Sequence, residues 1–412
     1  MIKFEKFVLE NGLKIIVHED KSSPLAAVNL LYDVGARDED SSRTGFAHLF
    51  EHLMFGGSQN ISDYDKVVQQ IGGSNNAFTT NDITNYYLTI PSNNLETAFW
   101  LESDRMNQLD FSLKSLDIQR NVVVEEFKQR YLNQPYGDAM LLLRPLAYKT
   151  HPYLWATIGK EIAHIEDAKL KDVEDFFYKH YGPQNCILTV VGNVDTGKVK
   201  QLAQKWFGDI PNRSGYVRNL KPEPRQTSER SLEVEKDVPA DSFYMTFHMD
   251  KKGSDEYNST DLLSDVLSRG NSSRFNQELI KNQKLFGNIE AYVTGSLDPG
   301  MFIISGKLLP EVKMEEAEKA IWIELEKLKA EIVGDRELQK LKNKIESTTV
   351  FEEIGVLNKA MNLAHFELLG DANGINSAVE KYQSLTAKDL KGSANLVFRK
   401  ENSSTLRYYS NK

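Results

Sequence analysis

The stretch that most constrains the fold is a short segment near the N-terminus that is typical of an amphipathic helix. It spans residues 45–57 and reads GFAHLFEHLMFGG. Its apolar residues recur at helical spacing, and its two closing glycines are typical of a helix end. Hydroxyl groups precede it and would cap the helix N-terminus; they belong to Ser41, Ser42 and Thr44.

Two histidines and a glutamate share this predicted helix. His48 and His52 lie four residues apart, so both imidazoles project from one face, and Glu51 stands at the edge of that face. Two neutral imidazoles on one face suit a borderline metal such as zinc, and a neighbouring carboxylate that is not a ligand is placed to take a proton from metal-bound water. This H-x-x-E-H spacing is a known zinc-peptidase pattern, the inverse of H-E-x-x-H. The alternative is a half-buried helix whose histidines are only hydrogen-bonded.

Charge and composition exclude several classes of protein. The chain of 412 residues carries a net charge of −9 and shows no basic stripe, which argues against a nucleic-acid partner. No apolar run approaches the length of a membrane span. Cys186 is the single cysteine, so an intramolecular disulfide is excluded, in keeping with a reducing compartment.

The N-terminus bears on location. No apolar segment of the signal-peptide type precedes the first predicted strand. If Met1 is the native start, a cytoplasmic location is expected. If a targeting segment has been removed, a periplasmic or organellar location is expected instead.

The predicted elements repeat once along the chain. Strands are expected in the first half at 7–17 (a hairpin), 26–34, 75–90 (two segments) and 185–191, and in the second half at 242–249, 288–294 and 301–308. Helices are expected between them, including 259–267 and 315–332. A polar, proline-bearing stretch at 212–227 separates the halves, so we expect domains at 1–211 and 228–412 joined by this linker.

Several short motifs carry a resemblance to a known family. They are the histidine motif at 48–52, GGSNNAFT at 72–79, RNVVVEE at 120–126, YGPQN at 181–185, VVGNVD at 190–195 and GNSSR at 270–274. On these residues the chain resembles the pitrilysin-type zinc peptidases, a metallopeptidase family that includes the mitochondrial processing peptidase and insulin-degrading enzyme. The resemblance implies an α+β fold (an α/β sandwich) of two homologous domains, each a mixed β-sheet covered by helices. Residues 1–211 would form the zinc-binding catalytic domain, and residues 228–412 would complete the chamber.

The resemblance also implies the third metal ligand. Alignment of RNVVV at 120–124 with the family pattern places this ligand at Glu126, with the adjacent Glu125 as the alternative. The implied cofactor is Zn²⁺, held by His48, His52 and Glu126, while Glu51 acts as the general base. Gln119 stands where family members commonly carry a further glutamate, which puts in doubt a supporting proton-transfer role at that position.

A further motif resembles the family's substrate-binding edge strand. It consists of Asn76, Ala77, Phe78 and Thr79. An exposed edge offers backbone N–H and C=O groups to an extended peptide, and the alternative is an ordinary internal strand. Asp82 and Thr84, just beyond, are candidates for orienting a ligand imidazole, with a plain turn role for Asp82 as the alternative.

Together these residues predict a zinc metalloendopeptidase that hydrolyses peptides or unfolded segments, with zinc-bound water as the nucleophile. The alternative is a non-catalytic peptide-binding or structural subunit of a larger assembly. The resemblance implies that four such domains build the peptidase, so a partner chain is expected.

The second half lacks one feature of active relatives, a C-terminal arginine and tyrosine seven positions apart. Aligned on Ser273-Arg274, those positions fall on Ile280 and Gly287, while Lys281 and Tyr292 lie out of register. We therefore expect a heterodimer with a homologous subunit that carries the Arg/Tyr pair, and a homodimer is the alternative.

Overall fold

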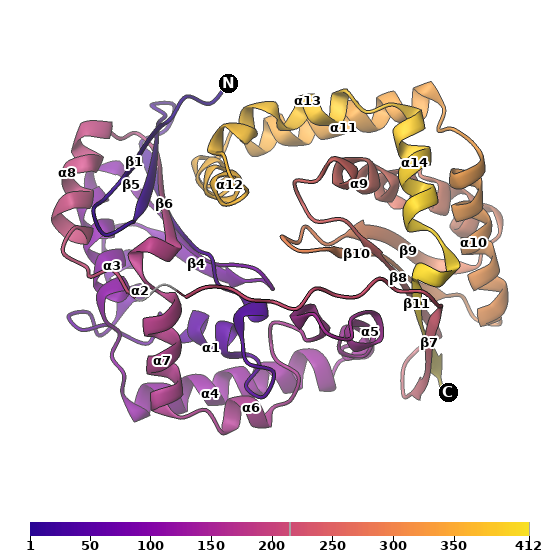
Figure 1. Ribbon diagram of the computed structural model, residues 1–412, viewed down its shortest axis with the longest axis horizontal. Helices are drawn as coiled ribbons and strands as arrows, with labels where there is room; N and C mark the ends of the chain where they lie inside the picture. The colour runs from indigo at the N-terminus through magenta and orange to yellow at the C-terminus, as the bar shows by residue number, and fades with distance from the viewer. Residues whose placement is uncertain (214–215, 412) are drawn as a thin grey trace. The chain divides into compact units, whose positions relative to one another are not determined.

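The computed structural model describes residues 1–213 and 216–411, which form two compact units (Figure 1). The first unit comprises residues 1–127, 155–220 and 349–377, and the second comprises 128–154, 221–348 and 378–412. Ser214 and Gly215 of the expected linker, and the last residue of the expected C-terminal domain, Lys412, lie outside the described residues. The expected boundaries at 211 and 228 stay a prediction, and the discontinuous composition of the units was not expected.

The first unit is built on a six-stranded mixed sheet with the strand order β1-β2-β6-β3-β5-β4. Its strands are β1 (Glu5–Val8), β2 (Lys14–Glu19), β3 (Leu25–Tyr32), β4 (Ser74–Thr79), β5 (Thr84–Pro91) and β6 (Cys186–Gly192). Only the β2–β6 pair is parallel. All seven residues of β6 are buried, as its near-continuous apolar sequence predicts for a central strand.

The second unit has a five-stranded sheet with the strand order β7-β11-β8-β10-β9. Its strands are β7 (Arg230–Lys236), β8 (Ser242–Met249), β9 (Phe286–Val293), β10 (Gly300–Leu308) and β11 (Ser403–Ser410). Only the β7–β11 pair is parallel. Numbered along the chain from β2 and from β7, both sheets follow the order 1-5-2-4-3. The predicted fold of two mixed sheets of the same design is therefore confirmed.

Helices cover both sheets. The first unit contains α1 (Phe46–Leu53), α2 (Tyr64–Gln70), α3 (Leu95–Asn107), α4 (Leu113–Phe127), α6 (Ala163–Glu166), α7 (Leu170–His180), α8 (Thr196–Phe207) and α12 (Val356–Leu368). The second contains α5 (Ala139–Ala147), α9 (Asp255–Ser268), α10 (Met314–Ala330), α13 (Ala378–Gln383) and α14 (Ala387–Val397). Helix α11 (Asp335–Glu352) begins in the second unit and ends in the first. Among the described residues, no helix is long and apolar enough to cross a membrane.

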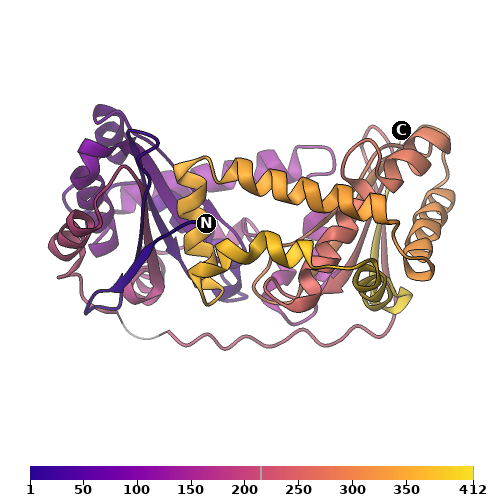
Figure 2. The same ribbon diagram turned by 90° about the horizontal axis from the view of Figure 1, so that it is seen from above.

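The two halves of the chain exchange one helix each. Helix α12, from the C-terminal half, packs on β3 and β6 of the first sheet (Figures 1 and 2). Its Ala360, Leu363 and Ala364 are fully buried. Two ion pairs also hold the helix, Glu367 with Lys6 of β1 and Lys359 with Asp20, the residue after β2. A helix that buries an apolar stripe in this way belongs to the core of the first unit.

The reciprocal exchange involves α5, which comes from the N-terminal half and packs on β11 and β8 of the second sheet. Its Ala139 and Leu143 form one apolar cluster with Leu406, Tyr408 and Val238. Because each half contributes a buried helix to the other unit, neither half of the chain contains a complete core.

Candidate active site

Helix α1 begins at the second residue of the predicted segment and presents its polar residues on one side. Its N-cap is Gly45, which has a φ of 91°. A Cβ there would lie 2.7 Å from Ile158 O, so this position requires glycine on both conformational and steric grounds. The apolar side chains of the helix are buried, while His48, Glu51 and His52 are half-buried. The helical spacing thus places all three polar groups away from the core.

The N-terminus of α1 is capped by a buried carboxylate. Glu39 Oε2 accepts from Gly45 N at 2.9 Å, and its Oε1 accepts from Ala47 N at 2.8 Å. Burial raises the pKa of Glu39 to about 8, although the hydrogen bonds from these two amides lower it. A carboxylate at this position satisfies orphan donors and suits the positive end of the helix dipole.

The prediction that Ser41, Ser42 and Thr44 cap the helix is wrong. The α1 N-cap has no side-chain cap hydrogen bond. Thr44 Oγ1 lies 2.8 Å from the ring nitrogen Nδ1 of His164, and Ser42 Oγ donates to Asp40. The loop folds back so that Glu39, six residues before Gly45, reaches the free amides, and no local spacing rule anticipates that contact.

Glu126 lies beside the two histidines. It is in the last turn of α4, and its Oε2 is 3.4 Å from His52 Nε2 and 3.7 Å from His48 Nε2. The two imidazole rings are 4.9 Å apart and nearly perpendicular. Glu125 is exposed and is not part of this group. The geometry therefore brings Glu126, and not its neighbour, together with the histidine pair.

The three donor groups fit a zinc ion by their chemistry and spacing. One ligand atom from each of His48, His52 and Glu126 can be chosen so that all lie within 4.8 Å of one another. Ligands about 2.0–2.2 Å from a tetrahedral zinc are separated by roughly 3.3–3.5 Å. Among the described residues, these are the only three His, Cys, Asp or Glu side chains grouped closely enough to hold a metal.

Glu51 lies outside this donor group and is held by the neighbouring strand. Thr79 Oγ1, at the end of β4, donates a hydrogen bond to Glu51 Oε2 at 2.6 Å. The carboxylate is thus placed between the histidine helix and the strand.

Strand β4 is the outer strand of the first sheet. It pairs with β5 alone, so its other edge has no strand partner among the described residues. The four residues of the predicted substrate-binding motif all lie in this strand; they are Asn76, Ala77, Phe78 and Thr79. Phe78 is 37% exposed, and its ring lies 6.5 Å from that of Tyr87. An edge strand is the arrangement that peptide binding by strand addition requires.

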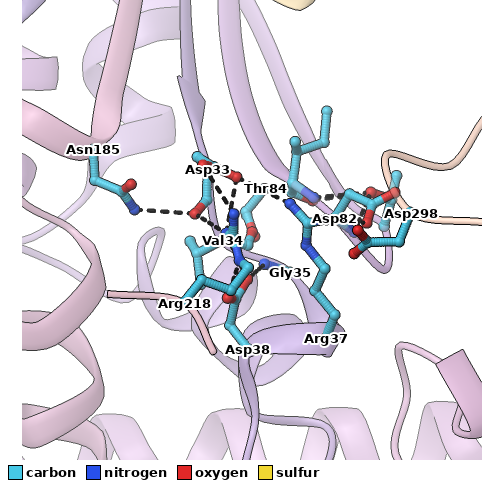
Figure 3. Close-up of polar contacts among 12 residues, drawn as sticks. Asp33, Val34, Gly35, Arg37, Asp38, Asp82, Thr84, Asn185, Arg218 and Asp298 are labelled. Atoms are coloured by element: carbon cyan, nitrogen blue, oxygen red, sulfur yellow. Dashed lines mark hydrogen bonds and ion pairs between the residues drawn. The ribbon is translucent and has the colours of Figure 1, made fainter. Parts of the chain in front are cut away.

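The loop that leads from β3 into α1 is anchored by a network of charged groups (Figure 3). Arg218 Nε donates to Asp38 at 2.7 Å, and the guanidinium also donates to the carboxylate of Asp33 at 2.9 Å. Arg37 pairs with Asp33 at 3.3 Å and with Asp82 at 3.2 Å. Arg218 lies within the stretch expected as a linker, so that part of the stretch is bound to the first unit.

Asp82 and Thr84 also belong to this anchored region. Asp82 pairs with Arg37, and Thr84 Oγ1 donates to Val34 O at 2.9 Å (Figure 3). Both residues therefore stabilise the loop before α1, and their role toward an imidazole stays a prediction. Glu39 and Arg218 were missed, because a buried cap and a distant ion pair leave no periodic signal in the sequence.

The second unit offers no side-chain donor at the two positions aligned with the family's arginine and tyrosine. Ile280 is partly buried against the hydrophobic core of this unit, and Gly287 is an exposed residue of β9. Lys281 donates to Asn271 O at 3.4 Å, and Tyr292 is 38% exposed on β9.

Comparison with known proteins identifies the family. Residues 14–143 match the family model described as insulinase (peptidase family M16), and residues 167–345 match the one described as the peptidase M16 inactive domain. The zinc protease PqqE of Helicobacter pylori is 30% identical over 410 residues, which cover 98% of this chain and 92% of that protein. The chain belongs to peptidase family M16. The resemblance to pitrilysin-type peptidases is thereby confirmed.

One further curated protein and two solved structures are also similar to this chain. The mitochondrial-processing peptidase subunit beta of Saccharomyces cerevisiae is 30% identical over 212 residues, 51% of this chain and 45% of that protein. The crystal structure of a protease from Helicobacter pylori matches with a TM-score of 0.94 and 29% identity over 99% of this chain and 100% of that one. Pitrilysin shares the fold, with a TM-score of 0.79 at 17% identity over 99% of this chain and 45% of that one. Membership of family M16 supports a peptidase function.

Proposed function

We propose that this M16 member is a zinc-dependent endopeptidase that cleaves peptides or unfolded polypeptide segments. The observation that carries the proposal is the grouping of His48, His52 and Glu126, with the carboxylate of Glu51 outside the donor set but on the same helix as the histidines. Two imidazoles and one carboxylate match the donor set of a catalytic zinc site, which keeps a fourth position open.

Each side chain of the site has its own task. His48, His52 and Glu126 would hold Zn²⁺, which when bound polarises a peptide carbonyl and lowers the pKa of water. Glu51 accepts a proton from the attacking water and returns it to the departing amine, since one carboxyl group can serve in both directions. Thr79 holds Oε2 of this carboxylate at hydrogen-bond distance.

The edge of β4 supports an extended peptide as the substrate. Backbone groups along Asn76–Thr79 face no further strand among the described residues. A peptide that pairs with such an edge gains main-chain hydrogen bonds whatever its sequence, so affinity comes with little sequence preference. This supports peptides and unfolded segments over folded proteins as substrates.

We expect the active form to include a homologous subunit that carries the Arg/Tyr pair, with a homodimer as the alternative. The side chains of Ile280 and Gly287 cannot donate hydrogen bonds, and loss of one oxyanion donor typically lowers kcat by about 10²–10³. A relative named as a subunit of a processing peptidase supports a partner for this chain as well.

The second candidate function is a non-catalytic structural subunit. It is favoured by the match of residues 167–345 to a model described as an inactive domain. The donor group and Glu51 lie outside that match, in the segment at 14–143 matched by the peptidase model. A scaffold has no need of all four side chains, so we rank the peptidase first.

The test combines metal analysis with turnover of a mixed peptide library. The purified chain is loaded with zinc and assayed alone, and then with a homologous M16 chain that has arginine and tyrosine at the aligned positions. We expect one zinc per chain and peptide cleavage that rises on mixing. A chain that binds zinc but cleaves no peptide under either condition would support the structural subunit. Full turnover by the chain alone, unchanged on mixing, would exclude the heterodimer.

A further inference from the structure

We infer that Thr79 is a positioning residue that fixes the general base relative to the strand on which the peptide lies. The inference rests on the proposed function and deepens it. The motif at 76–79 predicts that Thr79 contacts substrate, whereas the structure gives its side chain a different partner, the Glu51 carboxylate.

The contact has the geometry of a strong hydrogen bond. Thr79 Oγ1 lies 2.6 Å from Glu51 Oε2. An ionised carboxylate only accepts, so the threonine hydroxyl is the donor. Bonds of this type between a hydroxyl and a carboxylate are charge-assisted and typically about 2.5–2.7 Å long. Both side chains are half-buried, which limits competition from water.

The position of the hydroxyl is set by the sheet. Thr79 is the last residue of β4 and pairs with Thr84 of β5. The turn between the strands is closed by Thr80 N, which donates to Ile83 O at 2.8 Å, while Thr84 is buried and bonded to Val34 O. A donor on a paired strand holds its partner more precisely than one on an isolated loop, so Thr79 is a rigid support for Glu51.

Successive side chains of β4 point to opposite faces of the sheet, so the strand can hold Glu51 with one face while its backbone edge pairs with a peptide. Asn75, Ala77 and Thr79 share one face, and Asn75 donates to Asp65 of α2 at 2.9 Å. That face is therefore the helix-covered one. The backbone of the same residues forms the sheet edge that we propose for the peptide. Thr79 thus links the register of a bound peptide to the orientation of the base.

A positioning role predicts a specific kinetic pattern. Without the hydroxyl, Glu51 loses a hydrogen bond that orients its carboxylate. The rate of proton removal should fall while peptide pairing along the backbone persists. We expect Thr79→Val to lower kcat about 10- to 100-fold with KM nearly unchanged, because a misplaced base slows proton transfer but does not disturb backbone pairing of the peptide.

The experiment compares four zinc-loaded proteins: the parent, Thr79→Val, Thr79→Ser and Thr89→Val. Thr89→Val is the matched control. It makes the same change at a half-buried position of the neighbouring strand β5, five residues beyond Thr84. Zinc content, kcat and KM for one library peptide are measured on each, in the presence of the homologous chain. We expect Thr79→Ser to restore most of kcat and Thr89→Val to match the parent.

The outcomes separate the two proposals. If the parent cleaves peptides and Thr79→Val has the same kcat, or loses activity through a raised KM alone, the positioning role is excluded and the peptidase stands. A serine variant as slow as the valine variant would also overturn the positioning role. If the parent itself cleaves nothing, the proposed function fails, and the role of Thr79 fails with it.

Discussion

The five strands β2 to β6 of the first unit follow the same order in their sheet as the five strands β7 to β11 of the second. Strand β3 of the first sheet corresponds to β8 of the second, and the helices that follow these two strands differ. In the first unit β3 leads to α1, whose polar face carries two histidines and a glutamate. In the second unit β8 leads to α9, whose Leu262, Leu263, Val266 and Leu267 are fully buried. Both helices therefore bury apolar side chains at the same topological position, but among the described residues only α1 also carries candidate metal ligands.

This difference shows that the fold determines where the helix lies, whereas its side chains determine whether it can bind a metal. The polar residues of α9 serve structure, as when Asp261 accepts a hydrogen bond from the Tyr382 hydroxyl at 2.7 Å. In the part of the chain that the structure describes, only the first unit contains a three-residue donor group. Topology alone therefore does not identify the unit that carries the candidate metal site.

The first prediction concerns zinc affinity and compares the two adjacent glutamates of α4, where we expect the largest effect. Glu126→Gln should weaken zinc binding more than roughly 100-fold, because it removes a direct ligand. Loss of a group that only hydrogen-bonds to a ligand typically lowers metal affinity by roughly 10- to 100-fold. Glu125→Gln, its exposed neighbour, should bind zinc like the parent. Competition with a chelator measures both affinities. The reverse order of the two variants would mean that Glu125 is the ligand.

A second prediction tests the exchange of helices between the halves. Leu363→Ala in α12 should destabilise the first unit by about 2–5 kcal/mol, because this fully buried side chain packs in a core that lies mainly in the N-terminal half. Leu396→Ala in α14, where the leucine is 60% exposed, is the control and should change little. Hydrogen exchange should speed up in β3 for Leu363→Ala; faster exchange confined to the second unit would contradict the exchange of helices.

A third prediction compares two histidines, the buried His180 of the first unit and the half-buried His248 of the second. Burial lowers the pKa of His180 to about 3, with smaller contributions from Lys179 and Arg218. Burial also lowers the pKa of His248 in the second unit, but a hydrogen bond to Ala147 O opposes that shift. Since the His180 pKa is below its unfolded value near 6.5, its stabilising contribution is present above pH 6.5 and is lost as the pH falls toward 3.

Replacement of His180 should therefore make the first unit less sensitive to acid. Between pH 7 and pH 5 the parent should lose about 2 kcal/mol of unfolding free energy because of His180. His180→Phe should not show this part of the loss, whatever the substitution does to stability at pH 7. His248→Phe should change the pH dependence less. Urea unfolding at both pH values measures the effect. An unchanged pH dependence in His180→Phe would show that His180 is not the group responsible.

The smallest effect is expected at the helix cap. Glu39→Ala leaves the amides of Gly45 and Ala47 without their carboxylate and should cost about 0.5–2 kcal/mol of stability. Ser42→Ala, which removes a hydroxyl that the sequence pattern favoured as a cap, should cost less than Glu39→Ala. Thermal unfolding of both variants decides between the two caps.

The local hydrophobic pattern of the sequence predicted many of the strands and helices, and the spacing of the histidines predicted their common face. Strand β8 spans the expected residues 242–249, because apolar alternation and turn residues act over a few positions. The spacing of His48 and His52 sets their common face in any helix. Glu126 was identified through the family resemblance alone, since it comes from a different helix.

Features that depend on distant contacts were not predicted. Strands β7 and β11 pair across more than 170 residues of sequence, and the parallel pairing leaves no hairpin signal. The exchanged helices α5 and α12 have ordinary amphipathic patterns, which do not state which sheet they cover. The cap by Glu39 and the anchor by Arg218 depend in the same way on how loops fold back.

The most direct test of the proposed zinc site is Glu51→Gln, with zinc content and peptide turnover measured on one preparation. Glutamine keeps the size of the side chain but cannot accept the proton. We expect zinc to stay bound at the parent level while turnover falls on the order of 10²–10⁴-fold. Loss of the zinc would make Glu51 a ligand, and unchanged turnover would mean that another group is the base; either result would contradict the site described for the first unit.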